Sequence, residues 1–183
     1  MYYDEEPVPD FVQQGDIFRD FIITTIPKDF LVARGGFLDE NLEEGEATLK
    51  PSQSIPDLFS SGIELIVIRA TKSNVIVISQ SCDIQNREFV IIAPVFPLSR
   101  IESDKRVRAV KEGKTFYRFF LPQKEGIIEE AFVELTILNS VRRDCLSLER
   151  RILSLTHFYR GHFVYHLNRF LCRPFMPEET NGT

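Results

Sequence analysis

The feature of this sequence that most constrains its fold is a pair of β-prone runs separated by a short polar segment. The first run, Val75 to Ser79, is almost purely β-branched, and the second run, Phe89 to Val95, follows after the polar residues Gln80 to Arg87. β-Branched side chains fit the pleated, half-buried surface of a sheet. Two short runs this close together predict two neighbouring, mostly buried strands of one sheet.

Four further β-prone runs bring the expected number of strands to about six. They cover residues 17–26, 63–70, 115–121 and 131–138. The segment Thr71-Lys72-Ser73-Asn74 lies between the run 63–70 and Val75 to Ser79, so these two strands are predicted to form a hairpin. The strands follow one another without alternating helices, which favours an antiparallel sheet.

Two helices are also predicted. The first covers residues 98–112, where Ser99 and Glu102 have the spacing of a capping box and Gly113 follows as the C-terminal glycine. The second covers residues 156–171, where apolar side chains recur with helical spacing after Thr156, a candidate N-cap.

Together these elements predict an α+β fold. We expect a small, strongly bent antiparallel β-barrel of about six strands, with one basic helix and a C-terminal helix that closes one side. The whole chain, residues 1–183, is expected to be a single domain. Within it we expect an arm over 1–13, a core over 14–138 that includes helix 98–112, a helical closure over 139–174 and a tail over 175–183.

Composition narrows the class of protein. The acidic first ten residues do not resemble a signal peptide, and no apolar run approaches the roughly 20 residues that span a bilayer. The three cysteines are odd in number and widely spaced, which is typical of a reducing compartment. The sequence therefore predicts a cytoplasmic protein without a membrane partner, and oligomer formation is compatible with it.

Charge is distributed unevenly and suggests a binding face for RNA or DNA. Residues 1–66 carry a net charge of −10, whereas residues 67–183 carry +5. Cations with aromatic residues between them suit phosphate contact and base stacking. An alternative is that these cations pair with nearby glutamates on an ordinary surface. The predicted nucleic-acid-binding residues are Arg100, Lys105, Arg106, Arg108, Lys111, Arg142 and Arg143.

A cysteine- or metal-dependent hydrolase is a further hypothesis. Cys82 and Asp83 are the candidate catalytic residues, but Cys82 has no basic neighbour in the sequence that would activate its thiol. The alternative is a semi-buried structural cysteine at a strand end. His162 and His166 are spaced i, i+4, yet no cysteine or carboxylate pattern completes a metal site. No metal and no cofactor is therefore predicted.

Three motifs resemble the MazF/PemK-like barrel family over roughly residues 14–98. Gly15-Asp16-Ile17 opens a strand, Val75-Ile76-Val77-Ile78-Ser79 is a hydrophobic strand that ends in serine, and Val90-Ile91-Ile92-Ala93-Pro94-Val95 ends in an Ala-Pro-Val unit. The resemblance implies the barrel, and with it a nucleic-acid or partner surface of toxin–antitoxin or defence type.

The residues of the family's ribonucleases are not matched. Those enzymes carry an Arg-Pro pair before the second of these strands, where this chain has Thr71-Lys72-Ser73-Asn74. They carry a threonine after the Ala-Pro unit, where this chain has Phe96-Pro97. The leading hypothesis is thus nucleic-acid binding without the family's ribonuclease residues. The alternative is a protein–protein interaction adaptor that docks a partner through the acidic segment 36–46 or the aromatic C-terminal helix.

Overall fold

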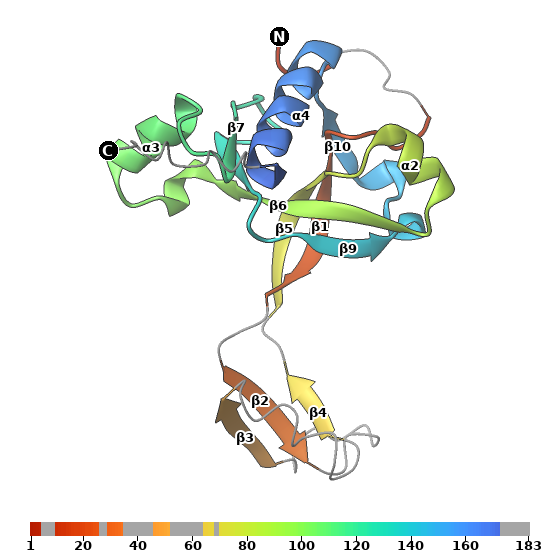
Figure 1. Cartoon of the computed structure of the whole chain (residues 1–183), viewed down its shortest axis with the longest axis vertical. Coiled ribbons are helices and arrows are strands. Elements are labelled where there is room, and N and C mark those ends of the chain that lie inside the picture. The colour runs from red at the N-terminus through yellow and green to blue at the C-terminus, as the bar shows by residue number, and fades with distance from the viewer. Residues whose placement is uncertain (5–9, 26–28, 35–45, 52–63, 68–69, 173–183) are drawn as a thin grey trace, which may run out of the picture. The chain divides into compact units, whose positions relative to one another are not determined.

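The computed structural model describes residues 1–4, 10–25, 29–34, 46–51, 64–67 and 70–172 (Figure 1). The described chain divides into two compact units, and the single domain over residues 1–183 stays a prediction. The first unit combines Met1–Phe21 with Ser73–Thr183, and the second is Ile22–Lys72. The acidic segment 36–45 and the predicted tail 175–183 lie outside the described residues.

A seven-stranded sheet dominates the described structure. Its strands follow the order β10-β1-β5-β6-β8-β7, and β9 also pairs with β6. Every pairing whose register the structure gives in this sheet is antiparallel. The strands are β1 (Asp16–Thr24), β5 (Ala70–Val77), β6 (Phe89–Pro97), β7 (Arg118–Leu121), β8 (Ala131–Glu134), β9 (Asn139–Arg142) and β10 (Arg151–Ser154).

The β-prone runs Val75 to Ser79 and Phe89 to Val95 belong to neighbouring strands, as predicted. Val75, Ile76 and Val77 of β5 lie opposite Pro94, Ala93 and Ile92 of β6. All three β5 side chains are fully buried, as are Val90, Ile92 and Ala93 of β6. The α+β class and the antiparallel sheet are therefore confirmed.

The predicted closure into a barrel is not confirmed. The sheet is open, because within the described residues no pairing joins β7 to β10 at its two ends. A helix closes the core instead: α4 (His157–Leu171) buries Phe163 and Leu167 against Ile17, Ile76 and Leu121 from three strands. Figure 1 shows α4 lying beside the sheet between β7 and β10. Thr156 caps α4 as predicted, since its Oγ1 accepts a hydrogen bond from the Tyr159 amide at 3.4 Å.

The hairpin predicted through Thr71-Lys72-Ser73-Asn74 is wrong. These residues lie inside β5, and β4 (Glu64–Val67) pairs instead with β2 (Asp29–Arg34). β2 also pairs with β3 (Glu46–Pro51), which completes a separate three-stranded antiparallel sheet. The four residues contain no glycine that would favour a tight hairpin turn, and Thr71 is β-branched, so the strand continues through them.

The helix predicted over residues 98–112 is divided. A 3-10 turn, η3 (Leu98–Arg100), comes first, and α3 (Asp104–Lys111) begins only after Ser103. The Leu98 amide donates to the Glu130 carbonyl at 2.8 Å, which ties this start to the chain just before β8. Ser103 is therefore the N-cap in place of Ser99. The predicted end is correct, because Gly113 has a positive φ of 66°.

The polar segment between the two central strands contains a helix that was not predicted. α2 (Ser81–Asn86) has six residues, fewer than two turns, and its only buried side chain is Ile84. The Ile91 amide donates to Ser79 Oγ at 2.9 Å, so the polar residue that ends the first run also binds the second strand.

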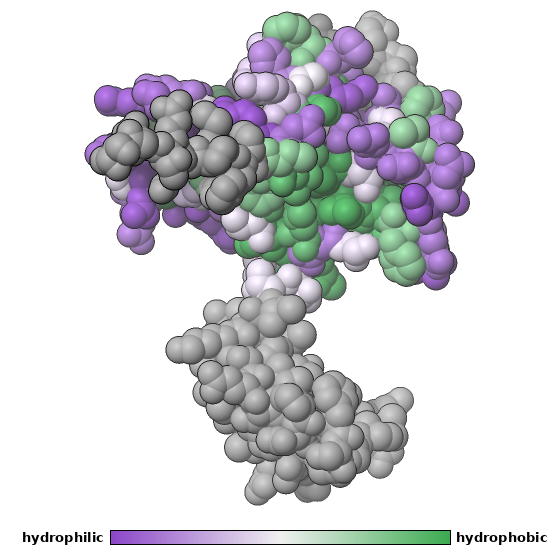
Figure 2. Space-filling view, in the orientation of Figure 1, coloured by the Kyte–Doolittle hydropathy of each residue, from purple (hydrophilic) through white to green (hydrophobic). Residues whose placement is uncertain are grey.

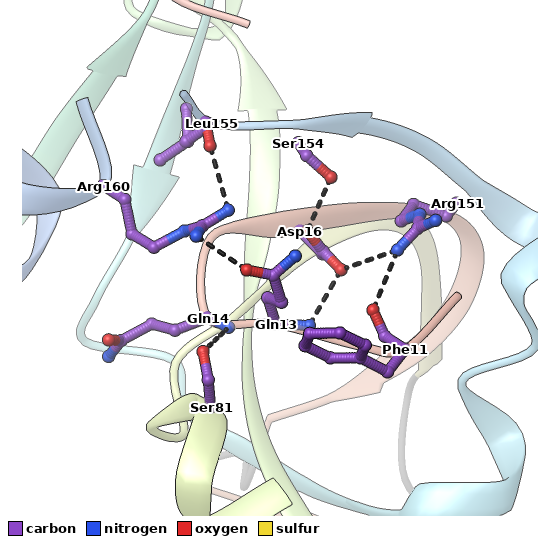
Figure 3. Close-up of polar contacts among 9 residues, drawn as sticks. All are labelled: Phe11, Gln13, Gln14, Asp16, Ser81, Arg151, Ser154, Leu155 and Arg160. Carbon is purple, nitrogen blue, oxygen red and sulfur yellow. Dashed lines mark hydrogen bonds and ion pairs between the residues drawn. The ribbon is translucent and has the colours of Figure 1, made fainter. Parts of the chain in front are cut away.

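A buried carboxylate connects the start of β1 with β10 (Figure 3). Asp16 is fully buried; its Oδ1 accepts from Ser154 Oγ at 2.6 Å and its Oδ2 accepts from the Gln13 amide at 2.9 Å. Arg151 Nη1 lies 3.2 Å from the same Oδ2. Burial raises the pKa of Asp16, while the hydrogen bonds from Ser154 and Gln13 and the charge of Arg151 act against that rise.

The residues around Asp16 extend this network to β5, α2 and α4. The Gln14 amide donates to Ser81 Oγ at 3.1 Å and its side chain donates to the Ile78 carbonyl at 2.7 Å. Arg160 of α4 donates to Gln13 Oε1 at 2.7 Å. Between them Gly15 has a φ of 86°, and a Cβ there would meet Leu155 Cδ1 at 3.2 Å, so only glycine fits without strain.

We expect Asp16→Asn to lower the free energy of unfolding by about 3 kcal/mol, because it leaves Arg151 largely buried without its carboxylate. Urea denaturation at neutral pH measures this change. Asp10→Asn, which alters an exposed aspartate near the same turn, is the matched control and should change stability by about 0.5 kcal/mol or less. Equal effects of the two substitutions would contradict the role assigned to Asp16.

Candidate functional site

Two pockets share α3 and β7 in the first unit. One, which we call the arginine pocket, has a volume of about 640 Å³, and the other, the aromatic groove, has a volume of about 460 Å³. The arginine pocket is defined here by Phe96, Arg100, Arg106, Arg118, Phe132 and Glu134. The aromatic groove is defined by Lys111, Phe120, Phe158, Tyr165, His166 and Arg169.

One line of side chains on α4 forms the outer wall of the aromatic groove. Phe158, His162, Tyr165 and Arg169 are spaced i, i+4, i+7 and i+11, so they follow a single stripe on the helix. Phe158 and Tyr165 are each 65% exposed, which is unusual for large aromatic side chains. The Phe158 and His162 rings contact each other edge to face with centroids 4.6 Å apart. The stripe therefore presents aromatic surface to solvent.

Cations lie next to these rings. The Arg169 guanidinium carbon is 6.0 Å from the centroid of Tyr165, and Lys111 Nζ is 5.8 Å from the centroid of Phe120. Lys111 also forms an ion pair with Glu130 at 2.6 Å, but both side chains are well exposed and such pairs are weak. Among the described residues that line the groove none is acidic, so the groove favours an anionic ligand.

His166 forms part of the inner wall. It is only 7% exposed, its ring lies 5.5 Å from that of Phe119, and its Nε2 is buried without a hydrogen-bond partner among the described residues. Burial lowers the pKa of His166, and the charge of Arg169 lowers it further, while the backbone of Phe116 and Thr115 acts in the opposite direction. The imidazole therefore favours its neutral form.

The arginine pocket has a floor of two phenylalanine rings with a guanidinium at each. The Arg100 guanidinium carbon lies 4.4 Å from the Phe96 centroid, and that of Arg118 lies 4.8 Å from the Phe132 centroid. The centroids of the Phe96 and Phe132 rings are 6.0 Å apart. Arg118 Nε donates to Glu134 Oε2 at 2.8 Å, and Thr136 Oγ1 donates to Glu134 Oε1 at 2.5 Å. Both ends of the floor thus carry oriented cations.

The structure separates the seven predicted cations into four groups. Arg100 and Arg106 line the arginine pocket, and Lys111 lines the aromatic groove. Lys105 and Arg108 are exposed on α3. Arg142 and Arg143 lie at the far end of β9, where Arg142 pairs with Glu88 at 3.1 Å and Asp144 at 3.0 Å. Arg143 donates to the carbonyl of Gln85 in the α2 segment.

Cys82 and Asp83 lie on α2 and are both exposed, so the interpretation of Cys82 as semi-buried is wrong. The Cys82 Sγ lies 3.8 Å from Gln80 Oε1. No hydrogen bond within the described ranges joins it to a histidine. The same part of the chain contains no group of three or more potential metal ligands, and no helix in it is long and apolar enough to cross a membrane.

Several residues of these pockets were not predicted. Phe158 and Tyr165 were detectable, because their i, i+7 spacing places them on one face of the predicted C-terminal helix. Phe96, Arg118 and Phe132 come from three different strands, so no local pattern could group them. Figure 2 shows apolar side chains gathered over the middle of the visible face of this unit, around β5, β6 and β9, with hydrophilic side chains on both sides.

The sequence itself adds no assignment. No family model matches it, and comparison with curated proteins finds no match.

The lowered pKa of His166 predicts how stability depends on pH. The ordinary pKa of histidine is about 6.5. Just below this pH the His166 side chain binds a proton more readily in the unfolded chain than in the folded chain, where its pKa is lower. The free energy of unfolding should therefore fall as pH drops through this range. In His166→Gln this part of the pH dependence should disappear, whereas in His157→Gln, which alters an exposed histidine on the same helix, it should remain. Denaturation curves between about pH 5 and pH 8 measure both; identical slopes in the two variants would contradict the assignment.

Proposed function

We propose that this protein binds single-stranded nucleic acid along the aromatic groove. The observation that carries the proposal is the exposed stripe of α4, where Phe158 and Tyr165 are open to solvent and Arg169 lies beside the Tyr165 ring. Lys111 lies beside Phe120 in the same groove. Bases stack on aromatic side chains, and cations track the phosphates of the same strand.

Single strands fit this surface better than duplexes. Stacking on a protein ring requires a base whose face is not already covered by its neighbours, and bases in loops and single strands meet this condition. The groove is open to solvent, and its exposed rings present faces on which unpaired bases can stack. The excess of basic residues in 67–183 supports the same ligand, even though the whole chain is acidic.

A protein partner is the second candidate, since exposed aromatic residues on a helix are also typical of docking surfaces. An adaptor would depend on the same Phe158 and Tyr165 but only weakly on salt. The third hypothesis, a hydrolase that uses Cys82, has no supporting contact among the described residues. The resemblance to MazF/PemK-like proteins and the toxin or defence role that it implies stay predictions.

Removing the exposed rings should weaken binding. We expect Tyr165→Ala and Phe158→Ala each to lower affinity for a 12-nucleotide single strand about tenfold, because each base stack contributes roughly 1–3 kcal/mol. Fluorescence anisotropy with labelled RNA and DNA measures this loss. Phe89→Ala is the matched control, since Phe89 is also exposed but lies on β6 outside the groove. An equal loss in the control would contradict the proposed site.

Salt dependence should separate the two candidate functions. Each phosphate contact made by a cation contributes about −0.7 to the slope of log affinity against log salt concentration for single strands. Arg169→Gln should therefore reduce the slope by about that amount, whereas Arg142→Gln, at a distant ion-paired position, should leave it unchanged. Nucleic-acid binding that is absent at low salt would reject the proposal and favour the adaptor.

A further inference from the structure

The arginine pocket has the features of a built anion site that neither the aromatic stripe nor the sequence motifs explain. Its two phenylalanine rings hold the guanidinium groups of Arg100 and Arg118 by cation–π contact at 4.4 and 4.8 Å. Such contacts restrict the planes of the guanidinium groups, so less conformational entropy is lost when a ligand binds.

Arg118 is the most strictly positioned of these cations. Glu134, which is almost fully buried, takes the Nε hydrogen of Arg118, and Thr136 in turn orients Glu134. No hydrogen bond within the described ranges occupies the terminal amino groups of Arg118. The carboxylate thus fixes the side chain while the donors that match an oxyanion stay available.

Two further cations, Arg100 and Arg106, face the same space. Neither Arg100 nor Arg106 forms an ion pair with any residue that the structure describes, although Glu102 also lines the pocket. Ser103, which precedes α3 and lines the pocket, makes no side-chain capping hydrogen bond. The first turn of α3 also contains Asp104, so the N-terminus of the helix is not counted among the donors of the pocket.

We propose that the arginine pocket binds the phosphomonoester group of a nucleotide. A phosphomonoester carries nearly two negative charges and three equivalent oxygens, which match several guanidinium donors better than the single charge of an internal phosphodiester. The attached base stacks on the outer face of the Arg100 guanidinium, since arginine planes accept bases as aromatic rings do.

The phosphomonoester comes from either of two sources, a free nucleotide or the phosphorylated end of a strand. The strand-end form rests on the proposed function, because the aromatic groove and the arginine pocket share α3 and β7 and one strand would occupy both. The free-nucleotide form is independent of it.

The test compares labelled 12-nucleotide single strands of one sequence that carry a 5′-phosphate, a 3′-phosphate or only hydroxyl ends, together with free adenosine monophosphate. One phosphorylated end should raise affinity about tenfold over hydroxyl ends. Arg100→Gln and Arg106→Gln should remove this advantage. Arg108→Gln removes a positive charge from the same helix at an exposed position outside both pockets, and it should keep the advantage. Unfolding midpoints of all variants confirm that each remains folded.

The outcomes separate the two proposals. In one outcome, strands bind in a way that depends on Tyr165, terminal phosphates make no difference, and adenosine monophosphate does not bind. This result overturns the phosphate site and leaves the proposed function intact. In another outcome, adenosine monophosphate binds, Arg106→Gln abolishes this binding, and no strand binds. This result supports the phosphate site and overturns the proposed function. A loss of the advantage in Arg108→Gln equal to that in Arg106→Gln overturns the assignment to this pocket, and absence of all binding rejects both proposals.

Discussion

The buried carboxylate of Asp16 is the interaction on which the rest of the first unit depends. It joins the turn before β1 to Ser154 and Arg151 of β10, which are distant in sequence. A buried charge is tolerated only when its partners are in place, so the contact specifies one pairing of these strands. The side-chain oxygen of the nearby Gln13 accepts a hydrogen bond from Arg160 of α4. The position of α4 along the core is thereby coupled to the same carboxylate.

Placement of α4 decides which of its side chains meet solvent. Phe163 and Leu167 enter the core, and Phe158 and Tyr165 remain on the outside next to α3. Phe158 and Tyr165 bury little surface in the core although both are large and apolar, and this supports the proposal that the stripe binds a ligand. The absence of acidic side chains from the described lining of the groove makes an anionic ligand the better match than an acidic peptide.

α3 connects the two proposed binding sites. Arg106 from its first half lines the arginine pocket, and Lys111 from its end lines the aromatic groove. A single eight-residue helix thus supplies cations to two neighbouring surfaces, because residues five apart project from different sides of a helix. A strand that crosses α3 would meet aromatic rings on one side and oriented guanidinium groups on the other.

The sequence by itself determined the elements whose signals are local. The β-branched run Val75 to Ser79, the N-cap Thr156 and the left-handed Gly113 each act within a few residues. The cap and the glycine were predicted correctly, and so was the strand except for its end, which lies at Val77. Tertiary structure decided everything that depends on which strands pair. β6 pairs with β9 along Phe89–Ile92 and with β8 along Val95–Pro97, so Arg142 lies at the opposite end of this strand from Arg100. The sequence predicted that these two cations lie on one binding face, whereas strand pairing places them far apart. The local sequence does not show which distant strands will pair.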